Sequence, residues 1–395
     1  MEAIDIAIIG GGPAGLRAAE VAAGMGRSVT IFDGKPSVGR KFLVAGKGGL
    51  NLTHEGTLEA FVSNYHGGCL WKDLISDFDN KALRDWCHGL GLETFQASSG
   101  RVYPKALKGA PVLRAWLGRL RELGVDIRPR HRWTELLSGN ILRFKNGAEF
   151  RAKAVIFALG GGSWPKTGSD GGWVEKFQAM GVSCSQLLPS NCGWECDWTT
   201  NILAEGEGFP IKNIVVRAGE TTVLGELMLT RYGFEGGAIY ALGRVLRGME
   251  EPVIHIDFKP TFSCEQLVEK LAGVSGDFLK TAIRRWKLSP PAAAILAERK
   301  PVTPAELAAL VKSCTIVLKG PRPIEEVISS AGGVKWEELH ENLMLRKFPG
   351  VFVCGEMVDW DAPTGGYLLQ AAFATGTRTG RAAGDFRTAL YETPS

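Results

Sequence analysis

The sequence predicts an α/β fold in which both ends of the chain form one discontinuous domain, with a β-rich domain and a small helical domain inserted between them. Three observations predict this fold. A buried strand, a run of glycines and a helix open the chain at residues 4–23. A second apolar strand ends in glycines at 160–162, and a third, at 350–354, is followed by a glycine pair at 365–366. Glycine-rich turns after buried strands are typical of phosphate-binding loops, so the three loops are expected to meet at one ligand.

The composition is that of a globular chain. Of 395 residues, 45% are hydrophobic and 22% are charged, which excludes a disordered protein and a coiled coil. The 51 glycines exceed the usual share and show no period, so they are expected in turns and ligand loops. The net charge of +4 does not by itself indicate nucleic-acid binding.

Targeting signals and metal-ligand patterns are absent from the sequence. No stretch approaches the roughly 18 apolar residues of a membrane span, and the N-terminus has no basic segment before an apolar one. The eight cysteines are scattered singly and are interpreted as buried thiols in a reducing compartment. The sequence therefore predicts a cytoplasmic protein with no membrane contact and no metal site.

The first loop fits the G-x-G-x-x-G pattern of dinucleotide-binding folds. Residues 4–9 read as a strand, residues 16–23 as a helix, and residues 29–31 as a second strand that ends at Asp33. Gly10 permits the tight turn, Gly12 lets a pyrophosphate approach the backbone, and Gly15 lets the helix lie close to the strand. Asp33 can accept both hydroxyls of an adenosine ribose, which favours FAD or NAD over NADP.

Further segments of the sequence distinguish FAD from NAD. Residues 39–41 bring two cations close to the first loop, where they can reach a pyrophosphate or a ribityl chain. The glycine pair at 365–366 opens a helix expected at 369–375, whose N-terminus can stabilise negative charge on a reduced flavin. NAD would need only the first loop, whereas non-covalent FAD explains all three. The predicted FAD-binding residues are Gly10, Gly12, Pro13, Ala14, Gly15, Asp33, Gly34, Gly39, Arg40, Lys41, Trp133, Ala158, Gly160, Gly161, Gly355, Glu356, Gly365, Gly366, Tyr367 and Leu368.

Six segments, taken in order, resemble one family. They are GRK at 39–41, GRVYP at 100–104, GGGSWPKTG at 160–168, GEL at 225–227, GGV at 332–334 and the block at 355–376. Over nearly its full length the chain resembles the BaiN/RdsA-like family of FAD-dependent oxidoreductases, also called YhiN-like flavoproteins. The resemblance implies a glutathione-reductase-type Rossmann FAD domain at 1–190 and 331–395, a β-rich domain at 191–260 and 313–330, and a helical domain at 261–312.

The loop at 45–54 departs from the family pattern. Many relatives carry an Arg-Cys-Asn triplet after a glycine run near the flavin. Here Gly49 and Leu50 replace the arginine and the cysteine, while Asn51 keeps the asparagine. The chain therefore resembles a subfamily in which chemistry that needs the cysteine is in doubt.

The segment at 101–132 combines a predicted helix with an excess of positive charge. Residues 111–123 have the apolar spacing of an amphipathic helix, and residues 125–133 alternate like a strand. Residues 101–132 hold nine Lys or Arg and two acids. A solvated surface that also neutralises cofactor phosphates and a site for a polyanionic substrate both explain this excess.

The inserted part reads as short strands followed by helices. Strands are expected at 211–217, 221–229 and 253–258, and capping residues at Ser263 and Thr303 predict two helix starts. Basic residues at 284–287 surround Trp286, which fits either a nucleic-acid contact or a solvated face anchored by one tryptophan. No second G-x-G-x-x-G occurs at 190–330, so NAD(P)H is expected only as a transient reductant.

The predicted function is an FAD-dependent oxidoreductase that transfers a hydride between flavin and an organic substrate. The resemblance implies reduction of an activated C=C bond, with uridine in ribosomal RNA as the leading substrate. Two alternatives remain: an oxidase of a small amine or ketone that uses oxygen, and a non-enzymatic RNA-binding protein that contains FAD. Candidate catalytic residues are Lys47, Asn51 and Tyr103, of which Tyr103 can donate a proton; Tyr103 as a packing residue and His54 as a plain loop residue stay open. The sequence leaves the substrate unresolved between a small molecule and RNA, and the oligomeric state unknown.

Overall fold

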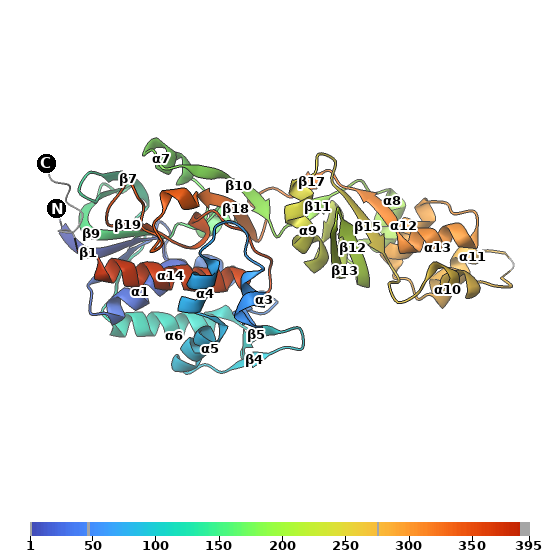
Figure 1. Cartoon of the computed structure of the whole chain (residues 1–395), viewed down its shortest axis with the longest axis horizontal. Coiled ribbons are helices and arrows are strands. Elements are labelled where there is room, and N and C mark those ends of the chain that lie inside the picture. The colour runs from blue at the N-terminus through green and yellow to red at the C-terminus, as the bar shows by residue number, and fades with distance from the viewer. Residues whose placement is uncertain (1, 46–47, 275, 388–395) are drawn as a thin grey trace. The chain divides into compact units, whose positions relative to one another are not determined.

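The computed structural model describes residues 2–45, 48–274 and 276–387, and it divides into two compact units (Figure 1). The first unit comprises Met1–Leu188 and Ile328–Ser395, so both ends of the chain belong to it. The inserted unit comprises Pro189–Val327.

The central sheet of the first unit joins strands from both ends of the chain. It contains β1 (Glu2–Ile9), β2 (Val29–Phe32), β6 (Asp126–Arg128), β7 (Trp133–Leu137), β8 (Ile141–Phe144), β9 (Glu149–Phe157) and β19 (Val351–Val353). The strands run in the order β6-β2-β1-β9-β8-β7, and β19 pairs with β9. The pairs among β6, β2, β1, β9 and β19 are parallel, which is the arrangement of a Rossmann-type α/β sheet.

The single strand expected at 125–133 is wrong. The chain forms β6 and β7 with a turn between them, in which Arg130 has φ +59°. Two backbone hydrogen bonds hold this turn against the residues that follow β2. The Arg130 amide donates to the Lys35 carbonyl at 2.9 Å, and the His131 amide donates to the Asp33 carbonyl at 2.8 Å. The local alternation of apolar residues did not reveal this tertiary contact.

Two helices from opposite ends of the chain lie side by side in the first unit, α1 (Pro13–Gly24) and α14 (Tyr367–Asp385) (Figure 1). A Cβ at Gly376 would lie 2.4 Å from the Ala14 carbonyl oxygen, and one at Gly380 would lie 2.6 Å from that of Ala18. Glycine at both positions therefore permits the close approach. The other helices of this unit are α2 (Arg40–Val44), α3 (Leu58–Val62), α4 (Trp71–Asp77), α5 (Asn80–Gly89), α6 (Gly109–Glu122), α7 (Val174–Ala179) and the 3-10 turns Pro165–Thr167, Trp336–Glu338 and Gly355–Met357.

Two smaller sheets complete the first unit. One is antiparallel and has the order β3-β5-β4, with β3 at Thr53–His54, β5 at Arg101–Pro104 and β4 at Thr94–Gln96. The other pairs β10 (Cys184–Ser190) with β18 (Ser329–Val334), the segments where the chain leaves this unit and returns to it.

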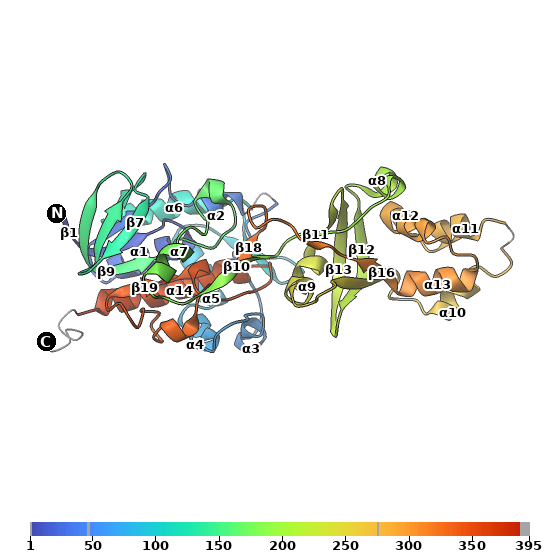
Figure 2. The ribbon, with the colours of Figure 1, turned by 90° about the horizontal axis from the view of Figure 1, so that it is seen from above.

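The inserted unit contains an antiparallel sheet with helices. The sheet order is β16-β15-β12-β13-β14-β11-β17. The strands are β11 (Trp194–Glu195), β12 (Pro210–Ala218), β13 (Thr221–Thr230), β14 (Gly233–Glu235), β15 (Val253–Asp257), β16 (Cys314–Val317) and β17 (Gly320–Pro321), and the helices are α8 (Thr200–Gly206), α9 (Gly237–Arg247), α10 (Cys264–Glu269), α11 (Phe278–Arg285), α12 (Pro290–Glu298) and α13 (Pro304–Lys312). Helices α10 to α13 gather at one end of this unit, beyond the strands (Figure 2). One continuous apolar core, which includes Ile254 in β15 and Leu307 in α13, joins sheet and helices.

Several local predictions for the inserted unit are confirmed. Ser263 and Gln266 form the expected capping box, and the Thr303 side chain accepts from the Glu306 amide. Trp286 is buried, so of its two interpretations the anchoring tryptophan is the one that this structure supports. Arg285 next to it donates to the Lys270 carbonyl at 2.5 Å.

The described residues hold no disulfide, no metal-binding group of side chains and no membrane-spanning helix. The described cysteines form no disulfide, and Cys69 is exposed, so the expectation of buried thiols is wrong at that position. Over residues 2–45, 48–274 and 276–387 no group of His, Cys, Asp and Glu could hold a metal ion. Among the same residues no helix has the length and apolar character needed to cross a bilayer.

Candidate functional site

The first glycine loop closes tightly on the strand β9 but is open at the start of α1. A Cβ at Gly10, where φ is +112°, would lie 2.3 Å from the Ala158 carbonyl oxygen, and one at Gly15 would lie 2.0 Å from the Gly10 oxygen. Gly12 precedes Pro13 as the N-cap of α1, has no side-chain cap, and would place a Cβ in open space. The helix start therefore has room beside the N–H groups of its first turn.

Asp33 is fixed at the end of β2 by two backbone groups. Its Oδ2 accepts from the Gly11 amide at 2.9 Å, and its Oδ1 accepts from the Lys35 amide at 2.8 Å. Burial raises the pKa of this carboxyl despite both bonds. Gly34 follows, and a Cβ at this position would lie 3.3 Å from the Cβ of Arg132. The two carboxylate oxygens keep further lone pairs that ligand hydroxyls can use.

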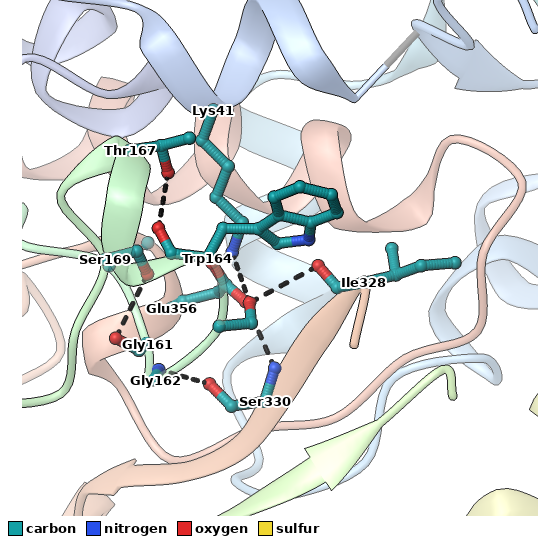
Figure 3. A network of polar contacts seen from close by, with 12 residues as sticks. Lys41, Gly161, Gly162, Trp164, Thr167, Ser169, Ile328, Ser330 and Glu356 are labelled. Atoms are coloured by element: carbon teal, nitrogen blue, oxygen red, sulfur yellow. Dashed lines mark hydrogen bonds and ion pairs between the residues drawn. The ribbon is translucent and has the colours of Figure 1, made fainter. Parts of the chain in front are cut away.

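Lys41 connects the second and the third glycine loops. It lies in α2, which begins after Gly39 (φ +68°). Its Nζ donates to Glu356 Oε2 at 2.7 Å and to Ser163 Oγ at 2.8 Å (Figure 3). Glu356 follows the C-terminal strand, and Ser163 follows the glycine run at 160–162. One ammonium group therefore joins segments more than 300 residues apart in the chain.

Ser330 extends this network. Its Oγ accepts from the Gly162 amide at 2.9 Å, and its own amide donates to Glu356 Oε1 at 3.3 Å (Figure 3). A Cβ at Gly161 would lie 1.9 Å from that Oγ, so no larger residue fits there. The Gly161 oxygen accepts from Ser169 at 3.0 Å. The sequence reasoning missed both Ser163 and Ser330 as parts of the site; their only signal was a place beside a glycine run.

The third loop ends at the start of α14. Gly355 (φ +70°) donates its amide to Thr375 Oγ1 at 3.0 Å, and a Cβ there would lie 2.9 Å from the Ala14 Cβ. Gly366 (φ +104°) caps α14 and leaves no room for a side chain, because a Cβ would lie 2.3 Å from the Thr53 backbone carbon. The third loop thus lies against the first loop and against β3.

Tyr367 and Leu368 form the first turn of α14. The Tyr367 ring stacks on His54 with centroids 5.5 Å apart, and its carbonyl accepts from Tyr65 Oη at 2.8 Å. Burial raises the pKa of Tyr367. His54 lies with its ring nitrogens 2.6 and 3.0 Å from the carbonyl oxygens of Glu55 and Ser99. These contacts fix the loop around His54 in place.

The three candidate catalytic residues differ in their surroundings. Lys47 lies outside the described residues. Asn51 has a buried Oδ1 with no partner among the described residues, which is unusual for a carbonyl oxygen. The Tyr103 ring stacks on Phe95, with centroids 5.8 Å apart, and lies next to Gly49, whose Cβ would be 3.3 Å away.

Trp133 belongs to the apolar core. Its ring is buried against Phe157 and Phe177, and its Nε1 donates to the Glu135 carbonyl at 2.8 Å. A ligand contact at this position would therefore involve the backbone of Trp133.

Ion pairs involve four of the nine basic residues of the segment at 101–132. Glu20 accepts from Arg119 at 3.0 Å, and Arg132 donates to Asp170 at 2.8 Å. Lys105 pairs with Glu93 at 2.5 Å, and Arg128 pairs with Glu2 and Asp126 at 2.7 and 2.6 Å. Local charge in the sequence thus overstates the positive charge that is free to meet a ligand.

These features fit FAD. The three loops predicted to hold one large ligand lie together within one unit: Lys41 joins the second loop to the third, and the third lies against the first at Gly355 and Ala14. The start of α1 beside Gly12 has the space that a pyrophosphate needs. Two buried polar atoms near the loops, Arg40 Nε and Asn51 Oδ1, have no partner among the described residues, and a ligand can satisfy them.

Comparisons with known proteins identify the family of the chain. Residues 4–382 match the family described as HI0933-like protein Rossmann domain. The chain is 28% identical to 3-dehydro-bile acid delta(4,6)-reductase of Clostridium scindens, with 96% of this chain and 99% of the relative covered. It is 22% identical to ribosomal RNA dihydrouridine synthase of Haemophilus influenzae, with 93% and 95% covered.

Solved structures share the fold. A 3-ketosteroid-delta4-(5alpha)-dehydrogenase from Rhodococcus jostii RHA1 superposes with a TM-score of 0.53 at 16% identity, over 97% of each chain. A 3-ketosteroid delta1-dehydrogenase from Sterolibacterium denitrificans also gives 0.53, at 10% identity, over 97% of this chain and 100% of that one. With the family match spanning nearly all of the chain, this protein belongs to the HI0933-like family and is an FAD-dependent oxidoreductase.

Proposed function

We propose that this protein reduces a C=C bond that is conjugated to a carbonyl group. The observation that carries the proposal is that glycine loops from both ends of the chain lie together, with Lys41 bonded to Ser163 and Glu356 and with Gly355 against Ala14, which supports one shared site for FAD. The names of two relatives indicate the class of reaction. Both of their names, a delta(4,6)-reductase of a 3-dehydro bile acid and a dihydrouridine synthase, describe the addition of hydrogen across a C=C bond next to a carbonyl.

We assign the cofactor contacts from the geometry of the loops. The start of α1 at Gly12 would hold the pyrophosphate, and Asp33 would accept the adenosine ribose hydroxyls. Lys41 and Glu356 would hold the ribityl chain, and the start of α14 at Gly366 would face the pyrimidine edge of the ring. Bound FAD supplies the hydride chemistry that the protein side chains lack.

The protein must also provide a proton and a place for the carbonyl. Reduction of an enone adds a hydride equivalent at the β-carbon and a proton at the α-carbon. Tyr103 is the candidate proton donor, because the residue is only half-buried and its ring is held by Phe95. The Asn51 amide and Lys47 are candidates for binding the carbonyl oxygen. NAD(P)H would act as a transient reductant, since no second dinucleotide motif occurs at 190–330.

Two measurements test this function. The purified protein should be yellow and should release FAD when it is denatured. After anaerobic photoreduction, a steroid enone or a uridine-containing RNA fragment should restore the absorbance of oxidised flavin, whereas the saturated analogue should not. Reoxidation by oxygen alone would favour an oxidase, and a flavin that no organic acceptor reoxidises would contradict the proposed reaction.

A further inference from the structure

One face of the small sheet β3-β5-β4 collects aromatic and positively charged side chains. Phe95 and Tyr103 are cross-strand partners, as are His54 and Arg101, and cross-strand partners project from the same side of a sheet. Arg101 and Tyr103 are two residues apart on β5, so they share this side, while Val102 between them is buried. Phe95, Tyr103, Arg101 and His54 are called the Arg101 face below.

The Arg101 face borders the start of α14. Arg101 Nε lies 3.8 Å from the position of a Cβ on Gly365. His54 stacks on Tyr367, the first residue of the helix. Tyr103 lies beside Gly49, in the loop that also carries Asn51. The face is therefore next to the segment that the proposed function assigns to the flavin ring.

Arg101 carries a charge that the described protein does not neutralise. Its side chain is exposed and makes no hydrogen bond or ion pair to another described residue. Its basic neighbours differ, because Lys105 pairs with Glu93 at 2.5 Å and Arg84 pairs with Glu55 at 3.3 Å. By contrast, Lys41 and Glu356 at the cofactor loops are largely covered by protein. An exposed guanidinium beside the exposed Phe95 ring and the half-buried Tyr103 ring fits a substrate better than it fits the cofactor.

We propose that the Arg101 face is the substrate-binding surface and that it selects a flat, largely apolar small molecule with an anionic oxygen group such as a carboxylate. The proposal rests on the proposed function for the place of the flavin. Phe95 and Tyr103 would lie against the flat body, since aromatic side chains offer large apolar area at a fixed orientation. Arg101 would bind the carboxylate, for which its planar fork of N–H donors is suited.

The charges beside Arg101 favour a small molecule over RNA. An RNA backbone requires several free cations in a row, but the basic neighbours Lys105 and Arg84 are both paired with acids. Arg101 is one cation and matches one anionic group.

Binding to the oxidised holoprotein tests the proposal without turnover. The probes are a steroid enone with a side-chain carboxylate and its methyl ester, and the readout is the change in flavin absorbance on titration. Arg101→Gln should weaken binding of the acid about 10- to 100-fold and leave the ester unchanged. Arg101→Lys should recover part of the loss, and Lys105→Gln, the matched control, should change neither affinity. Phe95→Ala should weaken acid and ester by a similar factor.

Several results would overturn the proposal. The first is that Arg101→Gln leaves the affinity for the acid unchanged. The second is that the wild-type protein does not bind the acid. The third is that Arg101→Gln weakens binding of acid and ester equally. A shift in the flavin midpoint potential with unchanged affinities would make Arg101 a cofactor contact instead. If Arg101→Gln weakens binding of a uridine oligoribonucleotide but not of the acid, the surface is an RNA site. If the binding pattern is found but the reduced protein is not reoxidised by the enone, the surface stands and the proposed reaction fails.

Discussion

Replacing Lys41 by methionine tests whether its contacts to the second and third loops hold the site together. The substitution keeps the aliphatic length of the side chain and removes its charge. In the structure Nζ is shared between Glu356 at 2.7 Å and Ser163 at 2.8 Å. The two charged side chains are only 24% and 18% exposed, so water replaces the lost partner poorly.

The size of the effect follows from what Glu356 would retain. Without Lys41 its carboxylate keeps the Ser330 amide at 3.3 Å, which is a long hydrogen bond. Losing one charged partner of a partly buried carboxylate costs about 1.5–3 kcal/mol. The Lys105–Glu93 pair is the matched control, because its side chains are 71% and 72% exposed. Lys105→Met should therefore change stability by less than about 1 kcal/mol.

A double-mutant cycle measures the interaction. Lys41→Met, Glu356→Gln and the double variant are compared as apoproteins by hydrogen exchange of β9 and β19, which reports opening of the first unit alone. Because Glu356→Gln removes the charge that Lys41→Met leaves unpaired, the double variant should be more stable than the sum of the single effects predicts, by about 1–2 kcal/mol. Additivity within about 0.5 kcal/mol would refute the reasoning and reduce the pair to an ordinary surface contact.

Three further predictions concern the loops and the proton donor. Gly15→Ala should destabilise the apoprotein by about 2 kcal/mol or more, because its Cβ would lie 2.0 Å from the Gly10 oxygen. Gly12→Ala should leave stability nearly unchanged and weaken FAD binding. If the two variants have equal effects in denaturation and in FAD titration, both assignments are wrong. Asp33→Ala should weaken FAD binding by about 1.5–3 kcal/mol. Because burial raises the folded-state pKa of Asp33, its contribution to apoprotein stability is present at low pH and fades as pH rises, while FAD affinity should fall as pH drops through that raised pKa; titrations at several pH values distinguish the two trends. Tyr103→Phe should slow reoxidation of the reduced flavin by substrate about 10²–10⁴-fold at normal FAD content, and an unchanged rate would leave Tyr103 a packing residue.

The first forty residues could be predicted from the sequence because every signal there is local. The expected strand at 4–9 and helix at 16–23 correspond to β1 and α1 with ends shifted by a few residues. The C-terminal helix was predicted too short. It was expected at 369–375, but α14 continues to Asp385 through three glycines at 376, 380 and 384. Glycine normally weakens a helix, yet two of these positions face the backbone of α1, where no side chain fits.

The polar interior of the first unit could not be predicted, because its partners are distant in sequence. Glu20 lies in the apolar helix α1 and is buried. Its carboxylate accepts from the Nε1 groups of Trp86 and Trp116 at 2.9 and 3.0 Å and from Arg17 and Arg119, both at 3.0 Å. Helical periodicity places Glu20 on a face but says nothing of four donors that come largely from other elements.

The loop at 45–54 bears on where the proton for reduction comes from. Leu50, which stands where relatives carry a cysteine, is buried, and its amide donates to the Leu107 carbonyl at 2.8 Å. The cysteine that precedes the third glycine loop cannot replace the missing thiol, because Cys354 is fully buried and burial raises its pKa to about 12. A thiol with so high a pKa is a poor proton donor at neutral pH. Neither position therefore supplies an acidic thiol next to the loops, and our proposal assigns proton donation to Tyr103, which is held beside Gly49 in the same region.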